Sequence, residues 1–226
     1  MLRQSGLFIS FEGTDGCGKS TQIGRLVERL RREGYEVLQT AEPGGTRIGG
    51  QVRRILLDRA NEALSPVAEL LLYFACRAQN VDEWIGPALA RGAIVVSDRF
   101  TDSTLVYQGA GRGLGREVVL ELDRIACRGL APDVTLYLDI DLETSLARAH
   151  RRNRESGDAR ETRMDEQSEE FHRQVREAYH RLAGEEPHRF RVIDGSRTPD
   201  EVAAAVWAAA EGALGKRAAP GWGNVR

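Results

Sequence analysis

The chain has 226 residues, a net charge of −2 at pH 7, and a composition that is 41% hydrophobic and 29% charged. This length suits one large α/β domain, and charged residues interrupt every apolar run before it is long enough to cross a bilayer. The near-neutral charge gives no reason to expect a nucleic-acid partner, and three scattered cysteines without metal-ligand spacing indicate reduced thiols. We therefore expect a cytoplasmic protein with neither a membrane nor a nucleic-acid partner.

Short apolar runs alternate with longer amphipathic stretches along the chain. The runs predict strands over residues 7–11, 36–40, 93–97, 134–138 and 190–193. The stretches predict helices over residues 20–33, 49–58, 66–91, 101–109, 116–128, 142–152, 165–183 and 198–214, the third of which would break, if at all, at Gly86-Pro87. This alternation favours the α/β class, with a five-stranded parallel sheet and helices on both faces.

Two segments depart from this pattern. Residues 151–163 read RRNRESGDARETR and lack apolar periodicity, which predicts a charged loop. Residues 215–226 are rich in glycine and proline, and we expect them to form a flexible tail. With no internal repeat or domain boundary elsewhere, residues 1–214 are expected to form a single domain.

The strongest motif lies between the first strand and the first helix, where Gly13 to Ser20 read GTDGCGKS. This is the G-x-x-x-x-G-K-[ST] pattern of a P-loop, whose backbone N–H groups surround phosphates at a helix N-terminus. Lys19 is expected to contact the β- and γ-phosphates, and the Ser20 hydroxyl to ligate Mg²⁺. The ATP-binding residues expected here are Gly13, Thr14, Asp15, Gly16, Cys17, Gly18, Lys19, Ser20 and Thr21.

The class of P-loop protein can be narrowed from lysine usage. Guanine-specific GTPases of the Ras type read the base with an N-K-x-D motif. Lys19 and Lys216 are the only lysines, and neither lies in such a motif.

Asp15 adds a carboxylate near the phosphates, which is unfavourable unless it points elsewhere. It either accepts a hydrogen bond from a substrate hydroxyl or is a solvent-facing partner of the helix N-terminus.

Three further segments decide the family. They are EPGGT at residues 42–46, LYFACRAQ at residues 72–79, and the block from Asp98 to Gly109, which reads DRFTDSTLVYQG. Together with the P-loop, and in the same order and spacing from about residue 7 to 214, they closely resemble bacterial thymidylate kinase. The resemblance implies MgATP-dependent phosphorylation of dTMP to dTDP by a homodimer. The alternatives are a kinase of another nucleotide or deoxynucleoside, and an ATP-binding regulator without a phosphoryl acceptor.

The resemblance also implies the positions of the acceptor site. Arg99, assisted by Arg53, would bind the dTMP phosphate, and Asp98 would orient Mg²⁺ through water. A structural ion pair of Arg99 with Glu42 or Asp98 is the alternative interpretation. The family resemblance further places Asp15 at the 3′-OH of dTMP and Tyr107 where it would exclude a ribose 2′-OH. The other dTMP-binding residues implied are Glu42, Pro43, Tyr73, Arg77, Ser103, Thr104 and Gln108.

Base selection is expected from the helix over residues 66–91. A guanidinium only donates hydrogen bonds, so Arg77 suits the O4 acceptor of thymine and would oppose the amino group of cytosine. Tyr73 stands where the family usually stacks a phenylalanine on the base, and core packing is its alternative role.

The lid of the family corresponds to residues 148–164. Members carry a catalytic arginine either in the P-loop or in the lid, and the variable P-loop positions here hold none. The resemblance favours Arg152 and Arg163 as catalytic and Arg148 at the ATP, while most of the lid arginines would form a solvated charge run. The full set of candidates is Arg148, Arg151, Arg152, Arg154, Arg160 and Arg163. The chain departs from the family pattern at Ala41, at Phe100 and in the sequence TRMD that ends the lid.

Overall fold

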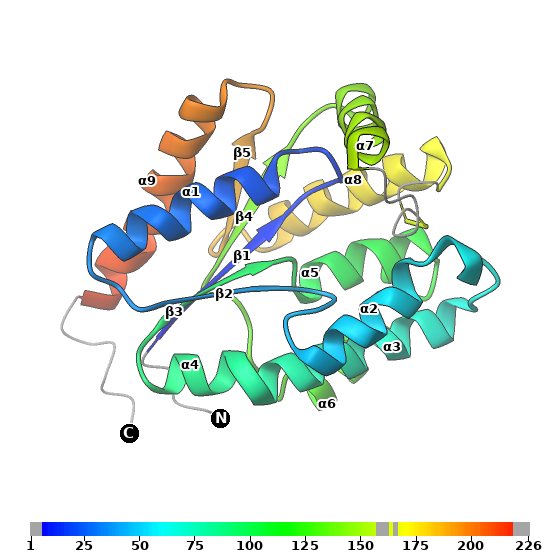
Figure 1. Cartoon of the computed structure of the whole chain (residues 1–226), viewed down its shortest axis with the longest axis horizontal. Helices are drawn as coiled ribbons and strands as arrows, with labels where there is room; N and C mark the ends of the chain where they lie inside the picture. The colour runs from blue at the N-terminus through cyan, green and yellow to red at the C-terminus, as the bar shows by residue number, and fades with distance from the viewer. Residues whose placement is uncertain (1–5, 157–162, 165–166, 219–226) are drawn as a thin grey trace.

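The computed structural model describes residues 6–156, 163–164 and 167–218. Its centre is a five-stranded parallel sheet in the order β2-β3-β1-β4-β5 (Figure 1). The strands are β1 (Leu7–Glu12), β2 (Val37–Ala41), β3 (Ile94–Asp98), β4 (Val134–Asp139) and β5 (Phe190–Asp194). The predicted sheet is confirmed, and each strand lies within one residue of its predicted bounds.

Helices cover both faces of the sheet, as predicted. On β1, the odd-numbered side chains pack in a core with α1 (Lys19–Arg32) and α9 (Pro199–Ala218). Phe8 packs in the opposite core, with α3 (Pro66–Asn80) and α6 (Arg116–Ala126). The other helical segments are α2 (Arg47–Leu57), η1 (Arg59–Asn61), η2 (Val81–Ile85), α4 (Gly86–Ala90), α5 (Thr101–Thr104), η3 (Leu105–Gly111), α7 (Leu142–Ser156) and α8 (Glu169–Glu185). Among the described residues, none of the helices is both long and apolar enough to span a membrane.

The long helix predicted over residues 66–91 departs from α-helical hydrogen bonding at a point before Gly86-Pro87, where the break was expected. The chain passes from α3 through the π-helical η2 into α4, so the irregular turn lies before Gly86-Pro87 rather than at it. A proline lacks an N–H and its ring crowds the carbonyl one turn earlier. A wider turn upstream accommodates that loss without ending the helix.

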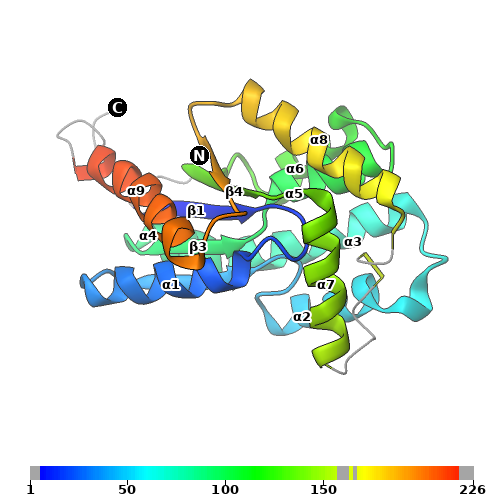
Figure 2. The ribbon, with the colours of Figure 1, turned by 90° about the horizontal axis from the view of Figure 1, so that it is seen from above.

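Two of the expected non-helical segments begin as helix. α7 continues to Ser156, through the first residues of the predicted charged loop, and crosses beyond the carboxyl ends of the strands (Figure 2). α9 continues to Ala218, through the first residues of the predicted tail. Arginine, glutamate and alanine are good helix formers. Apolar periodicity reports which helix face is buried, so its absence did not exclude a helix here.

Candidate active site

The P-loop turns tightly between β1 and α1. Gly13, Gly16 and Gly18 have φ values of 141°, 82° and 96°, a region that favours glycine. The Lys19 ammonium group is buried within the loop, where its Nζ donates to the carbonyls of Gly13 and Thr14 at 3.0 Å each. These two hydrogen bonds hold the lysine at the centre of the loop.

A cavity of ≈ 890 Å³ opens at the carboxyl edge of the sheet, beside the P-loop. It collects residues that follow β1, β2 and β3, because the carboxyl ends of parallel strands meet at one edge. The expected site residues that line it are Asp15, Gly16, Cys17, Gly18, Lys19, Ser20, Thr21, Glu42, Pro43, Arg53, Tyr73, Arg77, Asp98, Arg99, Ser103, Thr104, Tyr107, Gln108 and Arg148. Gly13, Thr14 and Arg163 do not line it, and the side chain of Arg152 lies outside the described residues.

Arg99 extends into this cavity from the end of β3. Its φ of 70° lies in the left-handed region, and it is one of two such non-glycine residues in the described part of the chain. The guanidinium forms an ion pair with Asp15 at 3.0 Å and donates to the hydroxyls of Ser103, Tyr107 and Tyr179 at 3.0–3.3 Å. The ion pair is therefore with the P-loop acid and not with Glu42 or Asp98.

Arg77 is held in a buried ion pair beneath the cavity. Its Nε donates to Oε2 of Glu42 at 2.6 Å, and both side chains are 1% exposed. The other bonds of the guanidinium go to Thr101, Phe100 and Thr104. Arginine has five N–H donors, and these hydrogen bonds to described residues use four of them in a side chain that also lines the cavity.

Tyr107 and Arg53 form parts of the same wall. The Tyr107 ring lies 4.9 Å from the Arg99 guanidinium carbon, and burial raises the pKa of its hydroxyl, so the phenol stays protonated. Arg53 donates to the carbonyl of Pro43 at 2.9 Å, which joins α2 to the EPGGT loop. Tyr73 is partly buried and lines the cavity, whereas its neighbour Phe74 packs in the core.

A second buried acid, Glu69 on α3, binds Gln108, which is one of the residues that line the cavity. It accepts hydrogen bonds from Gln108 at 2.8 Å and Arg112 at 3.2 Å, and forms an ion pair with Arg163 at 2.7 Å. Burial raises the pKa of Glu69, but these donors outweigh that effect and hold it below its usual value. Arg163, which also donates to the carbonyl of Leu56 at 2.6 Å, is only 4% exposed and faces this acid.

The remaining lid arginines divide by position. Arg148 and Arg151 on α7 line the cavity. Arg152 and Arg154 lie on the same helix, but their side chains are outside the described residues, and Arg160 lies outside them altogether. α7 is joined to the P-loop by Ser145, whose hydroxyl lies 2.7 Å from Thr14 Oγ1 and 2.6 Å from the carbonyl of Asp15.

Asp98 has the property expected of a metal-orienting carboxylate. Its Oδ1 atom is buried and has no hydrogen-bond partner among the residues that the structure describes. An unpaired buried oxygen of this kind is costly unless a ligand or water completes it. Asp98 lines the cavity together with Ser20, and because Mg²⁺ prefers oxygen ligands, these two residues would fit a Mg²⁺ site.

Sequence reasoning missed several parts of this site. Arg197 and Met164 line the cavity without having been expected there, and the acid Glu69 was not singled out. Arg197 could have been found from its place just after the fifth strand, at the ligand-binding edge of the sheet. A lone acid within the apolar run that precedes LYFACRAQ was the available signal for Glu69.

The parallel sheet, the phosphate-binding loop that follows its central strand and the arginine-lined cavity at the strand ends define a P-loop phosphotransferase. Residues 11–206 match the sequence model described as thymidylate kinase. The chain belongs to the thymidylate kinase family, as its motifs predicted.

Individual relatives agree with this assignment. The chain is 51% identical over 201 residues to a thymidylate kinase of Pelobacter propionicus, covering 89% of this chain and 92% of the relative. It is also 51% identical over 201 residues to one of Geobacter sulfurreducens, covering 89% and 94% of the two chains. A crystal structure of thymidylate kinase from Ehrlichia chaffeensis is 31% identical, with a TM-score of 0.73 and coverage of 91% and 98%.

Proposed function

We propose that this protein transfers the γ-phosphoryl group of ATP to dTMP, forming ADP and dTDP. The observation that carries the proposal is that the P-loop and the Arg99–Asp15 pair line one cavity. A phosphate nest thus lies beside a cation that can bind an acceptor phosphate. Direct in-line transfer depends mainly on such positioning and on charge stabilisation.

On the donor side, the P-loop N–H groups and Lys19 bind the ATP phosphates. Lys19 leaves the carbonyls of Gly13 and Thr14 to do so, which its flexible side chain permits. Ser20 and Asp98 would hold Mg²⁺, which when bound would neutralise charge on the phosphates. The unpaired Oδ1 of Asp98 supports this role.

On the acceptor side, Arg99 and Arg53 bind the phosphate of dTMP. Asp15 accepts from the 3′-OH and exchanges part of its ion pair with Arg99 for that bond. The unused N–H of Arg77 donates to O4 of thymine, and the Tyr107 ring occupies the space that a 2′-OH would need.

The lid supplies the last cation in this proposal. Arg148 and Arg151 already line the cavity, and Arg148 is assigned to the ATP. Arg152 and Arg163 remain the catalytic candidates. Arg163 can meet the transferring group only if its ion pair with Glu69 opens, since that contact holds its guanidinium outside the cavity.

We also propose that the protein is a homodimer. Exposed apolar side chains gather on α2, α3 and α6, of which α3 packs against both others. They include Ile55 (46% exposed), Val67 (57%), Leu71 (50%) and Ile125 (63%), whereas Leu70 is in the core. Leu71→Glu should therefore convert a dimer into a monomer in light scattering. A wild-type monomer would contradict the proposal.

The decisive experiment is a panel of acceptors with ATP and Mg²⁺, read by the identity of the product. We expect dTMP to be the best acceptor, followed by dUMP, with dCMP and UMP poor. The dCMP penalty arises because the donor-only Arg77 would face an amino group. If ATP is hydrolysed equally fast without an acceptor, the protein is an ATPase or a switch, and if UMP or dCMP is preferred, it is a kinase of another nucleotide.

A further inference from the structure

A buried carboxylate lies directly behind the arginine of the acceptor site. Side chains on a strand alternate between the two faces, so Glu12 at the end of β1 shares the face of Phe8. There it is 0% exposed, in a position that no part of the proposed mechanism uses. An acid this deeply buried is costly unless its oxygens are satisfied.

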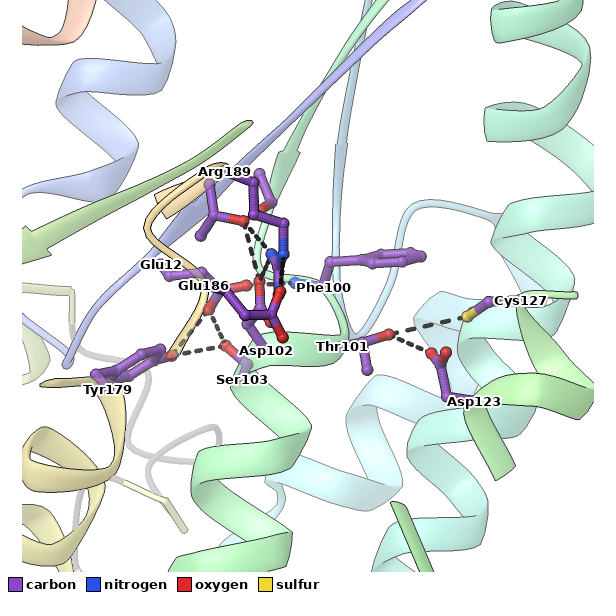
Figure 3. A network of polar contacts seen from close by, with 12 residues as sticks. Glu12, Phe100, Thr101, Asp102, Ser103, Asp123, Cys127, Tyr179, Glu186 and Arg189 are labelled. Carbon is purple, nitrogen blue, oxygen red and sulfur yellow. Dashed lines mark hydrogen bonds and ion pairs between the residues drawn. The ribbon is translucent and has the colours of Figure 1, made fainter. Parts of the chain in front are cut away.

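Three donors satisfy Glu12 (Figure 3). The backbone N–H of Phe100 donates to Oε1 at 2.8 Å. The Ser103 and Tyr179 hydroxyls lie 2.5 Å and 2.8 Å from Oε2, and they arrive from α5 and α8 respectively. The same two hydroxyl oxygens accept hydrogen bonds from Nη1 of Arg99.

The direction of these hydrogen bonds follows from the chemistry of the groups. A hydroxyl has one proton, and an ionised carboxylate only accepts. Once Ser103 and Tyr179 donate their protons to Glu12, both present lone pairs toward Arg99, which only donates. A neutral amide at the same position would reverse this arrangement, because its NH₂ group would occupy the hydroxyl lone pairs and turn their protons toward the guanidinium.

Glu12 also holds the main chain next to Arg99. The left-handed φ of Arg99 is unfavourable for a residue with a side chain and persists only where neighbours fix it. Its N–H donates to the carbonyl of Phe11 at 2.9 Å, and Ser97 Oγ donates to its carbonyl at 2.7 Å. The Phe100 N–H bond to Glu12 fixes the peptide that follows.

We infer that Glu12 is a positioning residue for the acceptor phosphate, acting through Arg99 by fixing both its backbone and the polarity of its hydroxyl partners. The inference rests on the proposed role of Arg99 in binding the dTMP phosphate. Glu12 itself touches neither substrate.

The titration of Glu12 agrees with this geometry. Burial, followed by the nearby charge of Asp102, raises the pKa of Glu12 to about 7, against the opposing effects of Arg99, Ser103 and Tyr179. The carboxylate form, which orients the two hydroxyls, therefore becomes populated as the pH rises through neutrality.

The test compares Glu12→Gln with a matched control, Asp102→Asn. Asp102 is a buried acid on α5 that binds Arg189 and Thr135, outside the hydrogen bonds of Arg99. We expect Glu12→Gln to lower kcat/KM for dTMP by about 10- to 100-fold, the scale of a misplaced binding group, with the ATP KM within about twofold of wild type. Asp102→Asn should lower Tm, and because loss of the Asp102 charge favours the carboxylate form of Glu12, it should leave the dTMP KM within about twofold.

A double-mutant cycle separates positioning from structure. In an Arg99→Ala background, Glu12→Gln should lower kcat/KM for dTMP by less than about threefold, because the group through which Glu12 acts is gone. If Glu12→Gln lowers kcat/KM for dTMP equally in the wild-type and Arg99→Ala backgrounds, or lowers kcat/KM equally for ATP and dTMP, the inference is overturned. Arg99→Ala alone tests the proposed function separately, since an unchanged dTMP KM there contradicts the role of Arg99 itself.

A second variant keeps the test valid if Glu12→Gln does not fold. Tyr179→Phe removes one of the two hydroxyls between Glu12 and Arg99 and keeps the ring in its stack on Tyr137. We expect about a three- to tenfold rise in the dTMP dissociation constant, measured by calorimetry without ATP. An unchanged constant would overturn the inference.

Discussion

The ion pair between Arg77 and Glu42 allows a quantitative prediction, because both side chains are 1% exposed. Arg77→Met keeps the aliphatic stem and removes the guanidinium. Glu42 is then left buried with Asn80 as its remaining side-chain donor, at 3.0 Å. Removing one partner of a buried pair costs about 3–5 kcal/mol, since the other charge stays desolvated.

For a chain of this size, each kcal/mol corresponds to about 2–4 °C, so Tm should fall by about 6–20 °C. The loss should also depend on pH. Burial raises the pKa of Glu42 and Arg77 opposes this, so in the variant the pKa rises further above its unfolded value. The folded variant therefore binds a proton more readily than the unfolded chain, and the deficit relative to wild type should shrink as the pH falls.

Thermal unfolding monitored by circular dichroism at several pH values measures both effects. The double variant Glu42→Gln/Arg77→Met should recover part of the lost Tm, because no buried charge remains unpaired. Below the Tm, the preference of Arg77→Met for dTMP over dCMP should also decrease. A single variant whose Tm lies within about 3 °C of wild type at all pH values would refute the reasoning.

Four further predictions concern residues of the proposed site. Lys19→Ala should nearly abolish turnover in a coupled ADP assay while its circular dichroism spectrum stays native; near-normal turnover would contradict the P-loop assignment. Tyr107→Ala should let UMP compete better with dTMP, whereas Tyr107→Phe should not. If kcat/KM for UMP relative to dTMP is the same in both variants, that result would argue against a steric barrier. Arg152→Ala should lower kcat by about 10²- to 10³-fold with little change in either KM. Arg163→Ala should lower Tm as well, because it leaves Glu69 with one ion pair fewer; an unchanged Tm would contradict that contact.

The residues of the site could be predicted from the sequence where they follow a strand. The P-loop, the EPGGT loop and Asp98-Arg99 come after β1, β2 and β3, and the parallel order of these strands places all three at one edge. Local motifs at the ends of parallel strands therefore imply a shared cavity. The roles of the individual residues within that cavity remain predictions.

What the sequence did not reveal are the partners of buried charges. Arg163 belongs to a charged run that suggested a solvated loop, yet its guanidinium meets Glu69 on α3, far away along the chain. Glu12 looks like the polar end of a strand, and only the tertiary contacts with α5 and α8 place it next to the two hydroxyls that bind Arg99. Such pairings leave no periodic pattern, because each one depends on two distant elements meeting.

The contact between the P-loop and α7 limits how this enzyme could change over evolution. A Cβ atom on Gly16 would lie 2.3 Å from the carbonyl oxygen of Ser145 and 3.0 Å from the amide nitrogen of Ala149, at a φ of +82°. An arginine cannot enter the loop at this position while α7 stays in place. A lineage exchanging a lid cation for one at position 16 would first need substitutions that displace the helix, so the packing of a single glycine constrains the order in which mutations can accumulate.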